Sequence, residues 1–275
     1  MSNNTIATQS GTPAHTPVYQ ESLLALNDDV CNTAIGRREF NLRHYLEYHP
    51  LLSLNALARL AEKMTPASVE CHKAKQAVLV PEGCEDVMSS FGDCVRNIES
   101  NGRWMALWNI EQVREYSDLL DILLDEVRPL LPTEEGLMVS SHAVIFISSP
   151  KAVTPAHFDP EHNFLLQIRG RKHINVGYFP DRRVARNELA RYHAGGHRNL
   201  TAIPPCSNFF NIEPGQGVYL YPWAPHWVYN GPSVSVSLSL TFHTSRSELE
   251  CIGYRNGGDM STAATRDSNA RNDQS

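Results

Sequence analysis

The sequence predicts a mainly β fold, a double-layered barrel or jelly roll, with helices flanking the N-terminal side of the core. Three observations support this fold class. The second half of the 275-residue chain holds several short apolar segments separated by Gly- and Pro-rich turns. Segment 233–242 alternates Val and Leu with Ser and Thr, which is typical of a strand with one buried face. Amphipathic helical patterns precede these segments. Many short strands with such turns favour a barrel or jelly roll.

The segment 39–129 is predicted to be mainly helical. Ser53 can cap a helix whose apolar residues recur at three-and-four spacing and which stops before Pro66. A second helix is predicted over 117–127, with Pro129 ending it. Their apolar stripes are interpreted as packing surfaces. Segments 77–80 and 104–108 are strand candidates between these two helical patterns.

From about His142 the chain changes to strand patterns. Strands are predicted at 143–147, 163–168, 173–178, 218–221 and 233–242. The Arg-Gly-Arg segment 169–171 is interpreted as a hairpin turn. Segment 185–207 does not fit this rhythm and is interpreted as a long excursion between strands, of the kind that often borders an active site.

We expect four parts in the chain. Residues 1–20 and 255–275 are rich in small polar residues and are predicted to be disordered tails. Residues 21–135 form the predicted helical region that packs on the barrel, and 136–254 form the predicted catalytic core.

Composition narrows the classes of function. The net charge of −6 argues against general nucleic-acid binding, which needs a basic surface. Five arginines crowd one segment, and we interpret it as a solvated loop while a local basic patch stays possible: Arg182, Arg183, Arg186, Arg191 and Arg198. The six cysteines form no C-x-x-C pair. No secretory signal or membrane-spanning apolar run is evident, so a cytoplasmic protein with free thiols and no membrane association is expected.

Three residues form a candidate metal site. His157 and Asp159 lie two apart at a predicted strand end, so both side chains can point to one face, and His226 follows 67 residues later within Y-P-W-A-P-H-W. Two histidines and one carboxylate can occupy one face of an octahedral iron(II) and leave the other face open. An isolated H-x-D is weak evidence, and a packing histidine beside a turn aspartate is the alternative. Lys172, on the next predicted strand, would need an anionic partner if buried, and a dicarboxylate cosubstrate would supply one.

These residues also carry a resemblance. The stretches V-T-P-A-H-F-D-P-E-H-N-F-L-L-Q-I-R-G-R-K and P-G-Q-G-V-Y-L-Y-P-W-A-P-H-W resemble the Jumonji-C oxygenases of the cupin superfamily. The similarity covers about residues 141–242. It is greatest to the small hydroxylases, represented by the asparaginyl hydroxylase that inhibits hypoxia-inducible factor, and to a group of bacterial cupin-like proteins. The resemblance implies a double-stranded β-helix that uses Fe(II), 2-oxoglutarate and O₂.

The resemblance also implies roles for individual residues. His157, Asp159 and His226 match the iron ligands, which carry the catalysis. Four residues match cosubstrate contacts: Lys172 and Thr154 at the distal carboxylate of 2-oxoglutarate, Asn163 beside the cosubstrate, and Thr241 where the hydroxylase has an asparagine. A tyrosine of the hydroxylase that touches 2-oxoglutarate is missing, because the corresponding stretch here is W-M-A-L-W.

The remaining histidines and tryptophans leave alternatives open. His162 and His173 are expected to face away from the metal. His193 and His197 could form a second metal site, although a polar loop that contributes to substrate binding is favoured. Trp223 and Trp227 bracket His226 and could be core residues or a hydrophobic shell around the iron.

The resemblance favours hydroxylation of a C–H bond on a protein or peptide side chain. A small-molecule hydroxylase with the same cofactors is the first alternative, and a non-catalytic cupin that binds a ligand or partner is the second. A homodimer is possible.

Overall fold

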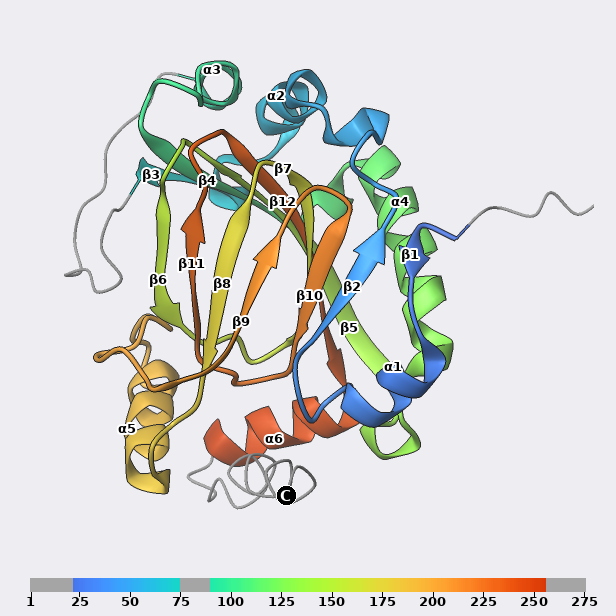
Figure 1. Ribbon diagram of the computed structural model, residues 1–275, viewed down its shortest axis with the longest axis vertical. Coiled ribbons are helices and arrows are strands. Elements are labelled where there is room, and N and C mark those ends of the chain that lie inside the picture. The colour runs from blue at the N-terminus through green and yellow to red at the C-terminus, as the bar shows by residue number, and fades with distance from the viewer. Residues whose placement is uncertain (1–21, 75–89, 256–275) are drawn as a thin grey trace, which may run out of the picture.

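The computed structural model describes residues 22–74 and 90–255. The strand candidate at 77–80 and the predicted tails lie outside these residues, except for Arg255, which is the last residue of a helix. Two antiparallel sheets face each other, and the helices lie along one side and at both ends of this pair (Figure 1). The predicted jelly-roll core is confirmed. The strands are β1 (Leu24–Ala25), β2 (Phe40–His44), β3 (Val69–Lys73), β4 (Arg103–Trp108), β5 (Met138–Ser148), β6 (Val153–His157), β7 (His162–Arg169), β8 (Lys172–Gly177), β9 (Cys206–Ile212), β10 (Gln216–Leu220), β11 (His226–Asn230) and β12 (Ser235–Thr244).

The larger sheet has the strand order β1-β2-β10-β7-β12-β5-β4-β3, and the smaller has the order β6-β11-β8-β9. The helices are α1 (Asp28–Ala34), α2 (Leu54–Lys63), α3 (Phe91–Arg96), α4 (Arg114–Val127), α5 (Arg182–His193) and α6 (Ser245–Arg255). None of the described helices is long and apolar enough to cross a membrane.

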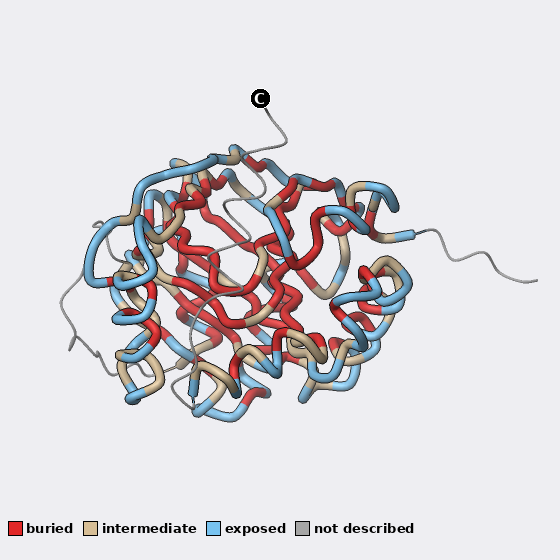
Figure 2. Tube along the Cα trace, turned by 90° about the horizontal axis from the view of Figure 1, so that it is seen from below, coloured by how far each residue is buried: buried red, intermediate tan, exposed pale blue. Residues whose placement is uncertain are grey.

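Both predicted N-terminal helices are confirmed. The Ser53 side chain accepts a hydrogen bond from the Ala56 N–H and so caps α2. Helix α4 begins one turn before the predicted start, and its apolar stripe, which includes the fully buried Leu123, packs on the outer face of the larger sheet. Figure 2 shows the strands as a buried band surrounded by exposed helix faces and loops. Burial of each large apolar side chain between α4 and the sheet contributes about 1.5–3 kcal/mol to stability.

The segment 39–129 is less helical than predicted, because it contains the three strands β2, β3 and β4. Strand β2 pairs with β10, and β3 and β4 extend the same sheet beyond β5. Only 104–108 was recognised as a strand candidate. These strands lengthen the larger sheet on both sides of the jelly roll, and β3 and β4 border the cavity described below.

The predicted hairpin at 169–171 is wrong. Strand β7 pairs with β10 and β12 in the larger sheet, whereas β8 pairs with β9 and β11 in the smaller sheet. The tight turn therefore carries the chain from one sheet to the other. Gly170 has a φ of +73°, and a β-carbon there would lie 2.4 Å from the Val234 carbonyl oxygen. Glycine is needed for both reasons.

Strand β12 confirms the predicted alternation, and both of its faces are buried. Its Val, Leu and Phe side chains join the core beneath the helices. The hydroxyls face inward and are also buried. Ser237 donates to Gln167 Oε1 over 2.7 Å, and Ser239 donates to Asn163 Oδ1 over 2.7 Å. The polar face of β12 therefore lines the space between the sheets rather than solvent.

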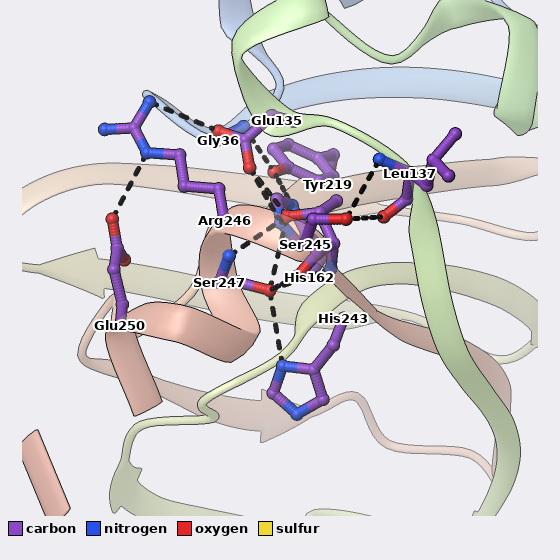
Figure 3. Close-up of polar contacts among 11 residues, drawn as sticks. Gly36, Glu135, Leu137, His162, Tyr219, His243, Ser245, Arg246, Ser247 and Glu250 are labelled. Atoms are coloured by element: carbon purple, nitrogen blue, oxygen red, sulfur yellow. Dashed lines mark hydrogen bonds and ion pairs between the residues drawn. The ribbon is translucent and has the colours of Figure 1, made fainter. Parts of the chain in front are cut away.

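A buried polar network anchors α6 to the end of the larger sheet (Figure 3). The His162 ring nitrogens lie 2.8 Å from the Tyr219 hydroxyl and 3.3 Å from the Thr244 hydroxyl, which donates to the Glu135 carboxylate. Glu135 also lies 3.7 Å from Arg246 of α6. Buried charges of this kind must be paired. His162 thus belongs to this network and faces away from the candidate metal site, as expected.

Candidate metal centre

The two candidate histidine ligands meet through strand pairing. His157 is the last residue of β6 and His226 the first of β11, and they are direct partners in this antiparallel pair. Their ring centroids lie 4.1 Å apart. Asp159 follows two residues after His157, and its carbonyl accepts a 2.7 Å hydrogen bond from the Trp223 N–H. The three side chains, 69 residues apart at the extremes, therefore form one group whose candidate ligand atoms all lie within 4.8 Å of one another.

Each imidazole is oriented by a backbone carbonyl. His157 Nδ1 lies 2.8 Å from the Pro155 oxygen, and His226 Nδ1 lies 2.9 Å from the Ala224 oxygen. A carbonyl can only accept, so each Nδ1 carries the proton and each Nε2 presents a lone pair. Such outer hydrogen bonds fix the tautomer of metal-binding histidines. This donor set of two imidazole nitrogens and one carboxylate oxygen fits iron(II).

The electrostatics favour a neutral imidazole and an ionised carboxylate. Burial, assisted by the neighbouring His226, lowers the pKa of His157 to about 3. Burial alone would raise the pKa of Asp159, but Arg198 and the two histidines outweigh it and lower that pKa. These protonation states are the ones that bind a cation.

One cavity contains all the predicted site residues, which are His157, Asp159, His226, Lys172, Thr154, Asn163 and Thr241. The structure thus brings together residues that the sequence analysis connected by spacing and resemblance. Asn163 of β7 and Thr241 of β12 are direct register partners on the larger sheet. The Thr241 hydroxyl donates to the His142 carbonyl over 3.0 Å. The tryptophans of the W-M-A-L-W stretch, Trp104 and Trp108, line the same cavity.

Lys172 is a buried basic residue that lines this cavity. Its side chain is 5% exposed, and its Nζ lies 5.9 Å from the centroid of the Phe146 ring. Across residues 22–74 and 90–255, nothing forms a hydrogen bond or ion pair with this ammonium. Burial lowers its pKa to about 7. An anion beside Lys172 would offset the desolvation, so the cavity fits an anionic ligand.

The predicted excursion contains helix α5 and a loop that returns to β9, and it borders the cavity as expected. The interpretation of its arginines as a solvated loop is wrong for two of them. Arg191 donates to the carbonyls of His197 and Asn199, and Arg198 Nη1 donates to Asp159 Oδ1 over 2.6 Å. No sequence signal separates these two arginines from their exposed neighbours on α5.

The other histidines and tryptophans also have defined places. His173 lies on the outer face of the smaller sheet, 2.7 Å from Asn211 Oδ1. Among the described residues, His157, Asp159 and His226 are the only group that could hold a metal, so His193 and His197 form no second site there. Trp223 and Trp227 are buried members of one hydrophobic cluster that packs behind the ligands.

Comparisons with known proteins support the fold. No protein-family model matches the sequence, and no curated protein matches it. The structure is similar to the X-ray structure of Escherichia coli YcfD, with a TM-score of 0.58 and 18% identity. It is also similar to YcfD, described as a ribosomal oxygenase, in complex with cobalt and 2-oxoglutarate, with a TM-score of 0.56 and 17% identity.

Both comparisons cover 84% of this chain. The chain spans just over half the length of these structures, 57% and 55% respectively. At this level of identity the similarity establishes a shared fold.

Proposed function

We propose that the protein is an Fe(II)- and 2-oxoglutarate-dependent oxygenase that hydroxylates a C–H bond. The observation that carries the proposal is the juxtaposition, in one cavity, of an open His-Asp-His metal site and a buried lysine with no anionic partner among the described residues. A structural metal site would not explain the buried lysine, and an anion-binding site alone would not explain the three candidate metal ligands.

The cavity residues divide into two groups with different tasks. His157 and His226 would hold the metal through Nε2, and Asp159 through Oδ2, which lies 3.9 Å and 3.6 Å from those two nitrogens. When bound, iron(II) would supply the oxidising chemistry by which 2-oxoglutarate, O₂ and a C–H substrate become succinate, CO₂ and a hydroxylated product.

Lys172 would pair with the distal carboxylate of 2-oxoglutarate. Thr154 would contribute a hydroxyl beside it, because Thr154 and Lys172 approach the cavity from strands on either side of β11. Asn163 and Thr241 would line the opposite wall. Binding the cosubstrate in this way excludes water from the ammonium and orients the keto acid toward the metal ligands.

A protein or peptide side chain is the substrate class that we favour. The similarity to a protein described as a ribosomal oxygenase supports this class. A small-molecule substrate is the alternative, and the mass spectrometry described below would detect it.

The test has two stages. The iron-loaded protein should convert 2-oxoglutarate to succinate in the presence of O₂ and ascorbate, and His157→Ala and Asp159→Ala should reduce the rate at least about a hundredfold. His173→Ala is the matched control, because this histidine lies on the outer face and should retain the rate. Mass spectrometry of peptide and metabolite mixtures then seeks a gain of one oxygen. Wild-type rates of succinate formation in both ligand variants would contradict the proposal.

A further inference from the structure

The two oxygens of Asp159 face different partners. Oδ2 lies toward the Nε2 atoms of both candidate histidine ligands, at 3.9 Å and 3.6 Å. Oδ1 accepts the 2.6 Å charge-assisted hydrogen bond from Arg198 Nη1. Hydrogen bonds between ionised partners are among the strongest in proteins. The carboxylate is therefore held with one oxygen toward the metal site and the other engaged elsewhere.

Arg198 is itself held in place on two sides. Its guanidinium lies over the Trp108 ring, 4.9 Å from the centroid, which is a cation–π distance. Its side chain is 29% exposed, and that of Asp159 is 12% exposed. A partly buried pair with a stacked guanidinium is screened from solvent much less than a surface ion pair.

The loop that carries Arg198 is fixed by a second set of contacts. Arg191 of α5 donates to the carbonyls on either side of Arg198, those of His197 and Asn199. Glu188 accepts from the Thr201 N–H over 3.0 Å and pairs with Arg191 over 3.0 Å.

The same loop is joined directly to the ligand-bearing strand. The Leu200 N–H donates to the Ala156 carbonyl over 2.7 Å, and Asn199 forms an isolated β-bridge with His157. These contacts join the loop that carries Arg198 to the strand that carries His157.

We propose that Arg198 is a positioning residue that restricts Asp159 to binding the metal through Oδ2 alone. This inference rests on the proposed metal centre. A carboxylate that can bind with one or two oxygens occupies one or two positions of the ion. With Oδ1 engaged by Arg198, Asp159 takes a single position, and both positions that 2-oxoglutarate needs for chelation stay open. Without Arg198, Oδ1 competes with the cosubstrate.

This role predicts a separation of two affinities. Removing Arg198 removes a positive charge next to a cation site, so affinity for the metal should not fall. Affinity of the metal-loaded protein for 2-oxoglutarate should fall instead. An arginine that merely supported the loop would lower both affinities or neither.

The experiment uses the full chain with Co(II), whose visible absorption reports its coordination. Co(II) titrations of the wild type and Arg198→Ala should give dissociation constants within about threefold. The visible spectrum of the variant should change before 2-oxoglutarate is added. The dissociation constant for 2-oxoglutarate on the Co(II)-loaded variant should rise by roughly tenfold or more, because Asp159 Oδ1 would then compete with the cosubstrate for one position of the ion.

Two further variants complete the test. Arg198→Lys keeps the positive charge and N–H donors without the planar guanidinium, and it should recover part of the lost 2-oxoglutarate affinity. Arg183→Ala, an exposed position on α5, is the matched control and should match the wild type in both affinities. If Arg198→Ala does not fold, Arg198→Lys and Arg198→Gln carry the same comparison.

The outcomes separate the inference from the function beneath it. A wild-type protein that binds neither Co(II) nor 2-oxoglutarate would overturn the proposed function and this inference with it. A wild type that binds both, with unchanged 2-oxoglutarate affinity and an unchanged spectrum in Arg198→Ala, would overturn only the role of Arg198. A loss of Co(II) affinity without a loss of 2-oxoglutarate affinity would also overturn that role.

Discussion

Replacing Lys172 with methionine should stabilise the protein without its cosubstrate and abolish its response to 2-oxoglutarate. The ammonium is buried at 5% exposure with no anionic partner among the described residues. A fall in its pKa from 10.5 to about 7 corresponds to a cost of about 5 kcal/mol, at about 1.4 kcal/mol per pKa unit. This figure is an upper limit, because water entering the cavity relieves part of the desolvation. Methionine fills a similar volume without a charge.

The sign of the pH dependence follows from the direction of the shift. Because the folded pKa of Lys172 is lowered, its cost is fully present below about pH 7 and disappears as the pH rises toward 10.5. The free energy of unfolding of Lys172→Met should therefore exceed that of the wild type by about 1–5 kcal/mol at pH 7. The difference should shrink steadily between pH 7 and pH 10.

The assay is urea denaturation of the Co(II)-loaded proteins with and without 2-oxoglutarate. At a ligand concentration one hundred times its dissociation constant, the wild type should gain about 2.7 kcal/mol, and the variant should gain almost nothing at that concentration. Lys63→Met is the control, because Lys63 is 61% exposed and its replacement should change stability by less than about 0.5 kcal/mol. A variant less stable than the wild type at pH 7, or one that keeps the full response to 2-oxoglutarate, would refute the assignment.

Two further substitutions test the fold that positions the site. Gly170→Ala should lower the free energy of unfolding by about 2 kcal/mol or more, because the added β-carbon would lie 2.4 Å from the Val234 oxygen, whereas Gly102→Ala, also at positive φ but with open space around it, should cost only about 1 kcal/mol. Equal costs in urea denaturation would show that the close approach at the sheet-to-sheet turn is not what requires glycine. Leu123→Ala on α4 should cost about 2–5 kcal/mol as a fully buried leucine, against less than about 0.5 kcal/mol for Leu137→Ala, where the side chain is 76% exposed. A small effect at Leu123 would show that α4 contributes little to the core.

The candidate ligands could be found from sequence because their chemistry is carried by residue type and local spacing. His157 and Asp159 are two residues apart. In a closed β structure, a histidine at the start of a later strand can lie close enough to them to be a third ligand. The sequence does not contain the register, however. Only the structure shows that His226 is the direct strand partner of His157.

The wrong predictions have a common physical origin. A local sequence pattern indicates a turn or a strand, but it does not indicate which other strand or loop that segment will pack against. The Arg-Gly-Arg segment correctly indicated a tight turn, but a tight turn can lead to the neighbouring strand or to the opposite sheet. The serines of β12 correctly signalled alternation, but a hydroxyl face suits a polar cavity as well as solvent. Arg198 could not be distinguished because its burial depends on how Arg191 and Glu188 fold the loop.

The most direct measurement of the central claim is the fate of molecular oxygen. The iron-loaded protein would be incubated with 2-oxoglutarate under ¹⁸O₂, and the succinate analysed by mass spectrometry with Asp159→Ala as the control. Oxidative decarboxylation divides O₂ between succinate and product, so the wild type should release succinate that carries one ¹⁸O atom and the variant should release none. Succinate that is absent, unlabelled or equally formed by Asp159→Ala would contradict the assignment of this cavity as an iron and 2-oxoglutarate site.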